Sequence, residues 1–288
     1  MSEDMKKIAG VMGWPISHSL SPRLHGYWIE KYGLNAEYRA WPVKPEELAK
    51  KLTALKSDCA AEEAVFRGTN LTIPLKETAF DVVDTLDPSA TRIGAVNTVV
   101  LDENGGLTGR NTDGIGFTDS LAEETDVTTL NGGTALILGA GGASRAIAVA
   151  LSDLGISEII ICNRSPSRAE SLAGHIGDVA RAAPWDRRSS LLEKADILVN
   201  CTSLGMTGQP PLEISLGGLK KTAIVSDIVY VPLETELLKR ARRQGHVAVD
   251  GLGMLLHLAK AGFEAWFGVK PEVDAALRAH VLDGLKGF

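Results

Sequence analysis

In the second half of the chain, short continuous apolar runs alternate with segments whose apolar residues recur at helical spacing. Short, continuously apolar runs bounded by Gly, Asn or Asp predict buried strands, while the segments between them carry apolar residues at helical spacing. The predicted strands are residues 135–138, 158–162, 197–200, 223–227 and 247–249, and the predicted helices include 168–176 and 235–244. Strands that alternate with helices in this way predict a doubly wound parallel sheet.

The first half of the chain carries the pattern of another α/β unit. An apolar strand is expected at Ile8–Met12, and a helix is expected to begin at Ser21-Pro22, with Ser as the N-cap and Pro in the first turn. Asn70 and Thr72 alternate with apolar residues along a strand that Pro74 should end, so both polar side chains should face the same side.

The turn after the strand at 135–138 is rich in glycine and opens a helix near Ala143. Gly139 would permit the tight turn, and Gly141 would let backbone N–H groups approach a phosphate at the positive end of the helix. A lone G-x-G-x-x-G is weak evidence, and its third position is Ser144 rather than Gly or Ala. The strand–turn–helix context nevertheless predicts a dinucleotide pyrophosphate site. Its predicted residues are Gly139, Ala140, Gly141, Gly142, Ala143 and Ser144.

The end of the next strand bears on the choice of cofactor. The segment Asn163-Arg-Ser-Pro-Ser-Arg168 has no carboxylate for a ribose 2′-hydroxyl, but it offers two guanidiniums and a hydroxyl for a 2′-phosphate. We therefore predict NADP rather than NAD, bound by Asn163, Arg164, Ser165 and Arg168. The alternative is that the two arginines are solvated charges at a helix entry.

These patterns predict two domains with a cleft between them, and 288 residues suffice for two cores. Residues 1–113 and the C-terminal helices of about 251–288 would form an α/β substrate-binding and catalytic domain. Residues 114–250 would form a Rossmann-type NADP-binding domain.

Composition excludes several other classes of protein. A net charge of −6 and the lack of a broad basic stripe argue against a nucleic-acid partner. The first seven residues have no apolar signal core, and no run approaches the ~20 apolar residues of a membrane span. Cys59, Cys162 and Cys201 lack metal-ligand spacing and are expected to be free thiols in a reducing cytoplasm. The six histidines are scattered, so we expect no metal.

Several motifs in a fixed order extend over nearly the whole chain. They are Gly13–Pro22, Asn70–Lys76, Gly94–Thr98, Asn111–Gly114, Asn163–Ser165, Asn200–Ser203, Asp227–Tyr230 and Asp250–Met254. In these motifs the chain resembles the shikimate dehydrogenase family. The resemblance implies NADP-dependent interconversion of 3-dehydroshikimate and shikimate, a step toward aromatic amino acids.

The reduction of a ketone requires a proton donor near the oxygen that accumulates charge. Lys76 is our candidate donor and Asp113 its partner, although a single Lys is more often a solvated surface charge. Ser19 and Ser21 would hold the substrate carboxylate, with plain N-capping as the alternative for Ser21. Asn97 would bind ring hydroxyls, or would simply satisfy a turn.

Family positions supply the remaining expected contacts. The predicted substrate-binding residues are Ser19, Ser21, Asn70, Thr72, Asn97, Asp113, Tyr230 and Leu258. The predicted further cofactor contacts are Thr202, Ile228, Gly251 and Met254, with Met254 beside the nicotinamide.

Leu258 departs from the family, whose pattern places a Gln four residues after the Met. Loss of that amide would weaken substrate binding by about 1 to 3 kcal/mol. Four alternatives remain open: a shikimate enzyme with a raised KM, a relative with another substrate such as quinate, an introduced substitution, and a catalytically weak ligand-binding relative. The partner is expected to be a small molecule, and the protein a monomer or homodimer.

Overall fold

The computed structural model describes residues 5–287. The expectation that the first seven residues lack a signal core falls partly outside this range, at residues 1–4. The chain divides into two compact units, which we call unit 1 (residues 1–112 and 258–288) and unit 2 (residues 113–257). The sequence placed these boundaries after residues 113 and 250.

The second boundary lies later than predicted because it falls inside one continuous helix, α9 (Gly251–Phe267). The first turns of α9 pack on α5 (Asp113–Glu124), where Gly253 lies against Ser120. The His257 imidazole Nε2 also lies 2.8 Å from Glu123 Oε1. These contacts assign the start of α9 to unit 2.

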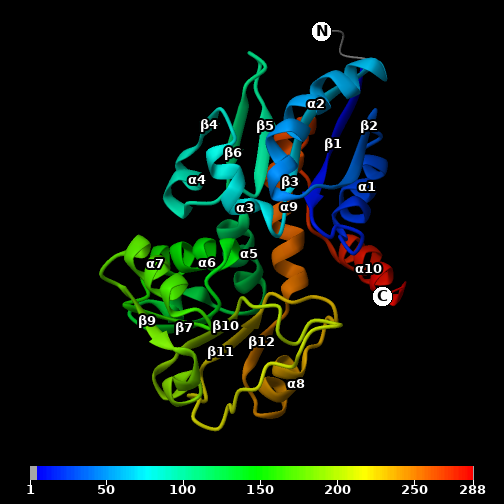
Figure 1. Cartoon of the computed structure of the whole chain (residues 1–288). Coiled ribbons are helices and arrows are strands. Elements are labelled where there is room, and N and C mark those ends of the chain that lie inside the picture. Colours follow the sequence, from blue (N-terminus) through cyan, green and yellow to red (C-terminus); the bar gives the residue numbers. More distant parts are fainter. Residues whose placement is uncertain (1–4, 288) are drawn as a thin grey trace. The chain divides into compact units, whose positions relative to one another are not determined.

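Unit 2 contains a six-stranded parallel sheet, as the alternating pattern predicted. Its strand order is β12-β11-β10-β7-β8-β9. The strands are β7 (Thr134–Leu138), β8 (Glu158–Asn163), β9 (Ala180–Pro184), β10 (Ile197–Asn200), β11 (Ile224–Asp227) and β12 (Val247–Val249). Helices α6 (Gly142–Asp153) and α7 (Pro166–Ile176) cover one face, and α8 (Glu236–Arg243) covers the other (Figure 1). The doubly wound arrangement is therefore confirmed.

Unit 1 contains a mixed sheet with the order β2-β1-β3-β5-β6-β4. Strand β5 runs antiparallel to both of its neighbours, whereas the other pairs are parallel. The strands are β1 (Lys6–Gly13), β2 (Ala36–Pro42), β3 (Ala64–Leu71), β4 (Thr85–Leu86), β5 (Thr98–Leu101) and β6 (Leu107–Arg110).

Helices cover both faces of this sheet. Leu48, Leu52 and Leu55 of α2 pack with Phe66 of β3 in one apolar core. On the other face, the Trp266 indole of α9 donates a 3.0 Å hydrogen bond to the Val99 carbonyl.

The helices of unit 1 besides α9 are α1 (Ser21–Lys31), α2 (Leu48–Ala61), α3 (Leu75–Thr78), α4 (Pro88–Ile93) and α10 (Ala275–Asp283). Single 3₁₀ turns lie at Pro45–Glu47, Ala79–Asp81, Val127–Leu130, Trp185–Arg187, Ser190–Lys194 and Gly284–Gly287.

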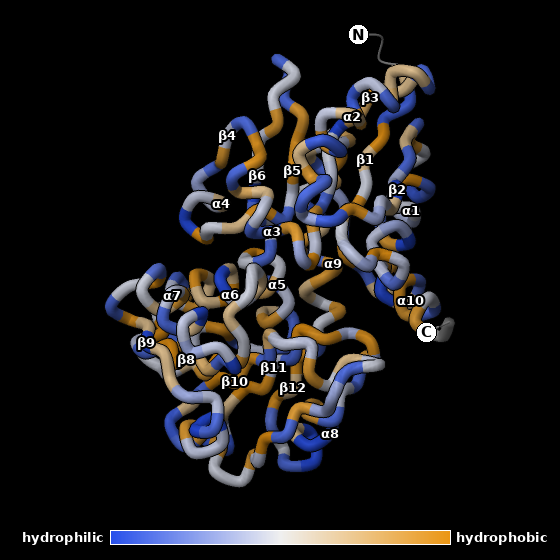
Figure 2. Tube along the Cα trace, in the orientation of Figure 1, coloured by the Kyte–Doolittle hydropathy of each residue, from blue (hydrophilic) through white to orange (hydrophobic). Residues whose placement is uncertain are grey.

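Apolar residues are concentrated in the sheets and in α9, whereas α8 is largely hydrophilic (Figure 2). The side chains of Leu252, Leu256, Phe263 and Trp266 on α9 are almost fully buried. Among the described helices, none has the length and apolarity needed to cross a membrane.

The cysteines are free thiols, as expected. Cys59 lies in unit 1, and Cys162 and Cys201 lie in unit 2. Burial raises the pKa of the Cys59 and Cys201 thiols and raises that of Cys162 to about 11.

Candidate active site

The predicted cofactor residues of unit 2 follow the carboxyl ends of its parallel strands. Gly139 follows β7, Arg164 follows β8, Thr202 follows β10, Ile228 follows β11 and Gly251 follows β12. Ligands of doubly wound sheets bind beyond this edge. The strand topology therefore gathers at one edge residues that are more than a hundred positions apart in the sequence.

The glycine-rich loop has the geometry that a pyrophosphate requires. Gly139 has φ +112°, a left-handed conformation that L side chains rarely adopt. Apart from Gly141 and its two chain neighbours, no atom of residues 5–287 lies within 4 Å of the position where a Cβ on Gly141 would stand. The first helical hydrogen bond of α6 runs from Arg145 N to Gly141 O, so the amides of residues 142–144 precede it. The open space and these amide donors fit a bound phosphate.

Ser144 faces the interior of this loop. Its side chain is fully buried, and its hydroxyl accepts a 3.2 Å hydrogen bond from Gly141 N. The hydroxyl also contacts the Cys201 thiol. A contact between Ser144 and a cofactor would thus come from its backbone N–H.

The arginine pair lies where α7 begins. Asn163 Nδ2 donates a 3.0 Å hydrogen bond to Ser165 O, which shapes the turn before the helix. Arg164 precedes the helix and Arg168 lies in its first turn, and both are exposed. Two guanidiniums beside the positive end of a helix fit a 2′-phosphate.

A buried polar network holds the loop after β10. Asn200 Oδ1 accepts hydrogen bonds from Thr202 N (3.1 Å) and Thr202 Oγ1 (2.7 Å). Asn200 Nδ2 donates to the Leu204 carbonyl (3.1 Å) and to Asp227 Oδ1 (2.9 Å). The position of Thr202 is thereby tied to the carboxylate that ends β11.

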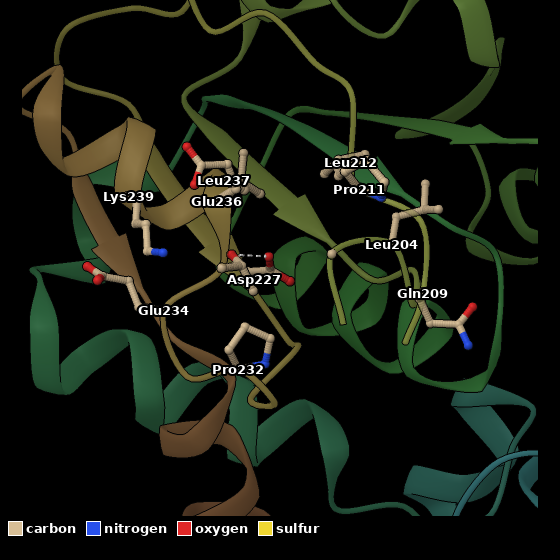
Figure 3. A pocket seen from close by; sticks show the side chains of 12 residues that line it. Leu204, Gln209, Pro211, Leu212, Asp227, Pro232, Glu234, Glu236, Leu237 and Lys239 are labelled. Carbon is tan, nitrogen blue, oxygen red and sulfur yellow. Dashed lines mark hydrogen bonds between the residues drawn. The ribbon is translucent and has the colours of Figure 1, made fainter. Parts of the chain in front are cut away.

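Asp227 receives two further hydrogen bonds. Val229 N donates to Oδ1 (3.1 Å) and Thr235 Oγ1 donates to Oδ2 (2.7 Å), the latter shown in Figure 3 as a dashed line. Burial raises the pKa of Asp227 to about 6, although the hydrogen bonds from Thr235, Val229 and Asn200 oppose the rise.

A cavity of about 290 Å³ lies beside this network, between the segment 204–212 and the start of α8. In Figure 3, Asp227 lies between the side chains of Glu234 and Lys239 and those of Leu204 and Gln209. The cavity does not include the glycine-rich loop, so we do not assign it to the pyrophosphate.

Two predicted substrate residues of unit 1, Asn70 and Asn97, meet at one edge of its sheet. Because β5 is antiparallel to β3 and β6, its amino end lies beside their carboxyl ends. Asn70 near the end of β3, Asn97 before β5 and Thr112 after β6 therefore come together.

Asn70 is held by three hydrogen bonds. Tyr38 Oη donates to its Oδ1 (2.7 Å), and its Nδ2 donates to Asn97 O (3.2 Å) and Thr98 Oγ1 (3.1 Å). With both amide hydrogens engaged, Asn70 can offer a ligand only its remaining acceptor position.

Asn97 supports the neighbouring backbone. Its Oδ1 accepts from Thr112 N (2.9 Å), and its Nδ2 donates to Thr112 Oγ1 (3.0 Å). Thr112 Oγ1 in turn donates to the Leu258 carbonyl (2.9 Å), which ties α9 to the same edge. This is the structural role that the sequence allowed for Asn97, and its contact with substrate stays a prediction.

The predicted N-cap at Ser21 is wrong. Leu20 is the N-cap, since its carbonyl accepts from Leu24 N (3.0 Å), and Ser21 is the first residue of α1. Ser19 Oγ accepts from Ser21 N (3.3 Å), so Ser19 provides the local support. The Ser21 hydroxyl contacts the Tyr38 phenol. Burial raises the pKa of Tyr38, and the contact with Ser21 partly opposes that rise.

The strand that was expected to reach Pro74 ends at Leu71. The chain turns there, because Leu75 N bonds to the Thr72 carbonyl (2.8 Å). Half-buried Thr72 lies just beyond the strand, and half-buried Lys76 lies on α3.

The two candidate catalytic residues belong to different units, since Asp113 is the fully buried first residue of α5 in unit 2. Tyr230 and Met254 also lie in unit 2. Tyr230 is half-buried with a raised pKa caused by burial, and Met254 is buried. Leu258 is half-buried in unit 1.

Comparison with known proteins bears on both units. The model of the shikimate dehydrogenase substrate binding domain matches residues 11–99, and that of shikimate / quinate 5-dehydrogenase matches residues 120–207. The shikimate dehydrogenase (NADP(+)) of Paramagnetospirillum magneticum is 49% identical, over 96% of this chain and 98% of its own length. The chain belongs to the shikimate dehydrogenase family.

Solved structures of this family have the same fold. Shikimate 5-dehydrogenase from Thermus thermophilus, in complex with NADP(H) and shikimate, has a TM-score of 0.82 at 36% identity, covering 98% of this chain and 99% of that one. Quinate dehydrogenase from Corynebacterium glutamicum, in complex with NAD, has a TM-score of 0.86 at 30% identity, covering 97% of this chain and 100% of that one.

The residues that support the predicted contacts received no role from the sequence, although all but Tyr38 lie in its motifs. These are Tyr38, Thr98, Thr112, Asn200 and Asp227. Asn200 and Asp227 each end an apolar strand with a buried polar side chain, and that signal could have identified them from the sequence.

Proposed function

We propose that this protein catalyses the reversible, NADP-dependent reduction of 3-dehydroshikimate to shikimate, a step in aromatic amino acid biosynthesis. The observation that carries the proposal is family membership over nearly the whole chain, with relatives named for this reaction. The protein is accordingly an oxidoreductase that acts on a CH–OH group.

The cofactor is NADP, held by unit 2. The glycine-rich loop and the first amides of α6 would bind the pyrophosphate, and Arg164 and Arg168 would bind the 2′-phosphate. Thr202, Ile228, Gly251 and Met254 would provide the remaining contacts. When bound, NADPH supplies the hydride that reduces the ketone.

Lys76 is the proposed proton donor. As the carbonyl becomes an alcohol, its oxygen gains negative charge, and the Lys76 ammonium would deliver a proton to it. In the reverse direction the neutral amine would take the proton from the hydroxyl. Asp113 would accept a hydrogen bond from a substrate hydroxyl and act with Lys76 as a proton-transfer pair.

Polar groups of unit 1 would orient the substrate ring. Ser19 and Ser21 would bind its carboxylate, and the remaining acceptor position of Asn70 suits a ring hydroxyl. Thr72 and Asn97 would add contacts from the same sheet edge. Tyr230 would contribute from unit 2.

Leu258 is proposed to affect affinity rather than reaction type. The named relatives favour shikimate, and they do not favour quinate or a non-catalytic role. A leucine in place of the family's Gln removes one polar contact, so we expect a raised KM for shikimate.

We further propose a cytoplasmic location, which its free thiols support, and a monomeric or homodimeric state.

The test is the absorbance of NADPH formed when purified protein is mixed with NADP and shikimate, with quinate and NAD in parallel reactions. Saturable, shikimate-dependent formation is expected. If no mixture forms reduced cofactor although the protein binds NADPH, the proposed function is wrong.

A further inference from the structure

Asp227 connects two loops that carry predicted cofactor contacts. Its Oδ1 accepts from Asn200 Nδ2 (2.9 Å) on one side and from Val229 N (3.1 Å) on the other. We propose that Asp227 is a positioning residue that fixes Thr202 and Ile228 for NADP binding. The inference rests on the proposed NADP site in unit 2.

The first connection passes through Asn200. This side chain is fully buried and uses its Oδ1 to hold both the backbone and the hydroxyl of Thr202. Its Nδ2 is oriented by Asp227 Oδ1, because an amide that donates at Nδ2 must present Oδ1 on the opposite side. Without Asp227, Asn200 Nδ2 would keep only its hydrogen bond to the Leu204 carbonyl, so its orientation would be held less firmly.

The second connection is direct. The hydrogen bond to Val229 N fixes the peptide after Ile228, and Ile228 N itself donates to the Asn200 carbonyl (3.1 Å). A Cβ on Gly251 would collide with the Ile228 backbone, so the start of α9 packs closely on this loop. A shift of Ile228 would therefore also disturb Gly251, another predicted cofactor contact.

A cavity lies beside this network. The cavity of about 290 Å³ borders both Leu204, at the end of the Thr202 loop, and Asp227. Hydrogen bonds therefore add to packing in holding the loop position. Asp227 is 1% exposed and its partners in residues 5–287 are neutral donors, so its burial is unfavourable unless every one of those bonds forms.

The test compares Asp227→Ala with two variants of unit 2. Asp227→Asn keeps an acceptor at Oδ1 and serves as the rescue. Asp196→Ala is the matched control, because Asp196 also accepts a backbone hydrogen bond in this sheet, from Thr134 N (2.9 Å), but at the amino end of β7. Each folded variant is titrated with NADPH by fluorescence, and KM is measured separately for NADP and for shikimate.

We expect Asp227→Ala to raise the Kd for NADPH by about 10- to 100-fold, as expected for loss of a buried hydrogen-bonding partner. Its KM for NADP should rise in parallel, while its KM for shikimate changes little. Asp227→Asn and Asp196→Ala should bind NADPH as wild type does.

Two results would overturn the inference: unchanged NADPH affinity in Asp227→Ala, or an equal loss in Asp196→Ala. If Asp227→Ala does not fold, Asn200→Ala decides the question. It removes the side chain that links Asp227 to Thr202, leaves the bond from Val229 N to Asp227 in place, and should also weaken NADPH binding. Unchanged affinity in that variant would likewise contradict the proposal. Failure of the wild-type protein to bind NADPH would refute the proposed function instead.

Discussion

The hydroxyl of Tyr38 offers a sharp test of how unit 1 presents Asn70. The change Tyr38→Phe removes one oxygen atom, the donor of the 2.7 Å hydrogen bond to Asn70 Oδ1. The ring remains, and with it the 4.0 Å stack on His25. The change therefore removes the partner of two predicted substrate contacts, the Asn70 amide and the Ser21 hydroxyl, and leaves the ring packing in place.

The size of the expected effect follows from the burial of both side chains. Tyr38 and Asn70 are 8% and 6% exposed, so water does not readily replace the lost donor. Leaving a buried acceptor without its partner costs about 1 to 3 kcal/mol. If about 1 kcal/mol of this loss appears in substrate binding, KM for shikimate rises about fivefold. Burial lowers the pKa of His25 to about 3, so the stacked imidazole stays neutral and the effect should be the same across neutral pH.

Two assays separate the outcomes. Initial rates of NADPH formation at varied shikimate give kcat and KM, and thermal unfolding gives the stability change. Tyr32→Phe is the matched control, because its hydroxyl accepts a hydrogen bond from Glu272 N (3.2 Å) elsewhere in unit 1. A wild-type KM for shikimate in Tyr38→Phe, or an equal rise of that KM in Tyr32→Phe, would refute this role of the Tyr38 hydroxyl.

Four further predictions concern other parts of the site. Lys76→Ala should lower kcat by about 10²- to 10⁴-fold with a smaller change in KM, and near-normal turnover would exclude Lys76 as the proton donor. Leu258→Gln should lower KM for shikimate by about 10- to 100-fold, whereas an unchanged KM would show that this position does not contact substrate. Replacing Arg164 and Arg168 together by Ala should raise KM for NADP by about tenfold or more and leave that for NAD nearly unchanged; equal effects on both cofactors would argue against a 2′-phosphate site. Because the folded-state pKa of Asp227 is raised from 3.8 to about 6, its contribution to stability is present below 3.8 and lost as pH rises through 6. The melting temperature of Asp227→Asn relative to wild type should therefore increase from about pH 5 to about pH 8, and a constant difference would contradict this pKa shift.

The strands of unit 2 could be predicted from the sequence because a parallel strand buried on both faces must be continuously apolar. Residues 197–200 and 247–249 are strands as predicted, and the order of the elements required a doubly wound sheet. The edge strand β9 was missed, since its residues Ala180–Pro184 are only partly buried and lack such a run.

Local patterns failed where tertiary contacts decide the outcome. Ser21-Pro22 has the composition of a helix start, but the carbonyl of Leu20 takes the first helical hydrogen bond. The start of α9 belongs to unit 2 because it packs on α5, and no periodicity within the helix reveals that contact.

The site could be predicted only as far as residues that would touch a ligand. Gly139 and Gly141 have the backbone conformation and the open space expected of them. The residues that orient the contacts, such as Tyr38 for Asn70, depend on the pairing of strands and helices distant in the sequence. A polar residue that ends an apolar strand, as Asp227 does, is the most accessible signal of this kind.

Because free thiols lie in both units, their alkylation can report local opening of the protein. A thiol reacts with alkylating reagents as the thiolate, and burial here disfavours that form at all three cysteines. Cys59 and Cys162 are buried, so Cys59 would become reactive when unit 1 opens and Cys162 when unit 2 opens. Pulsed alkylation followed by peptide mass spectrometry could thus follow the opening of each unit separately within one unmodified chain.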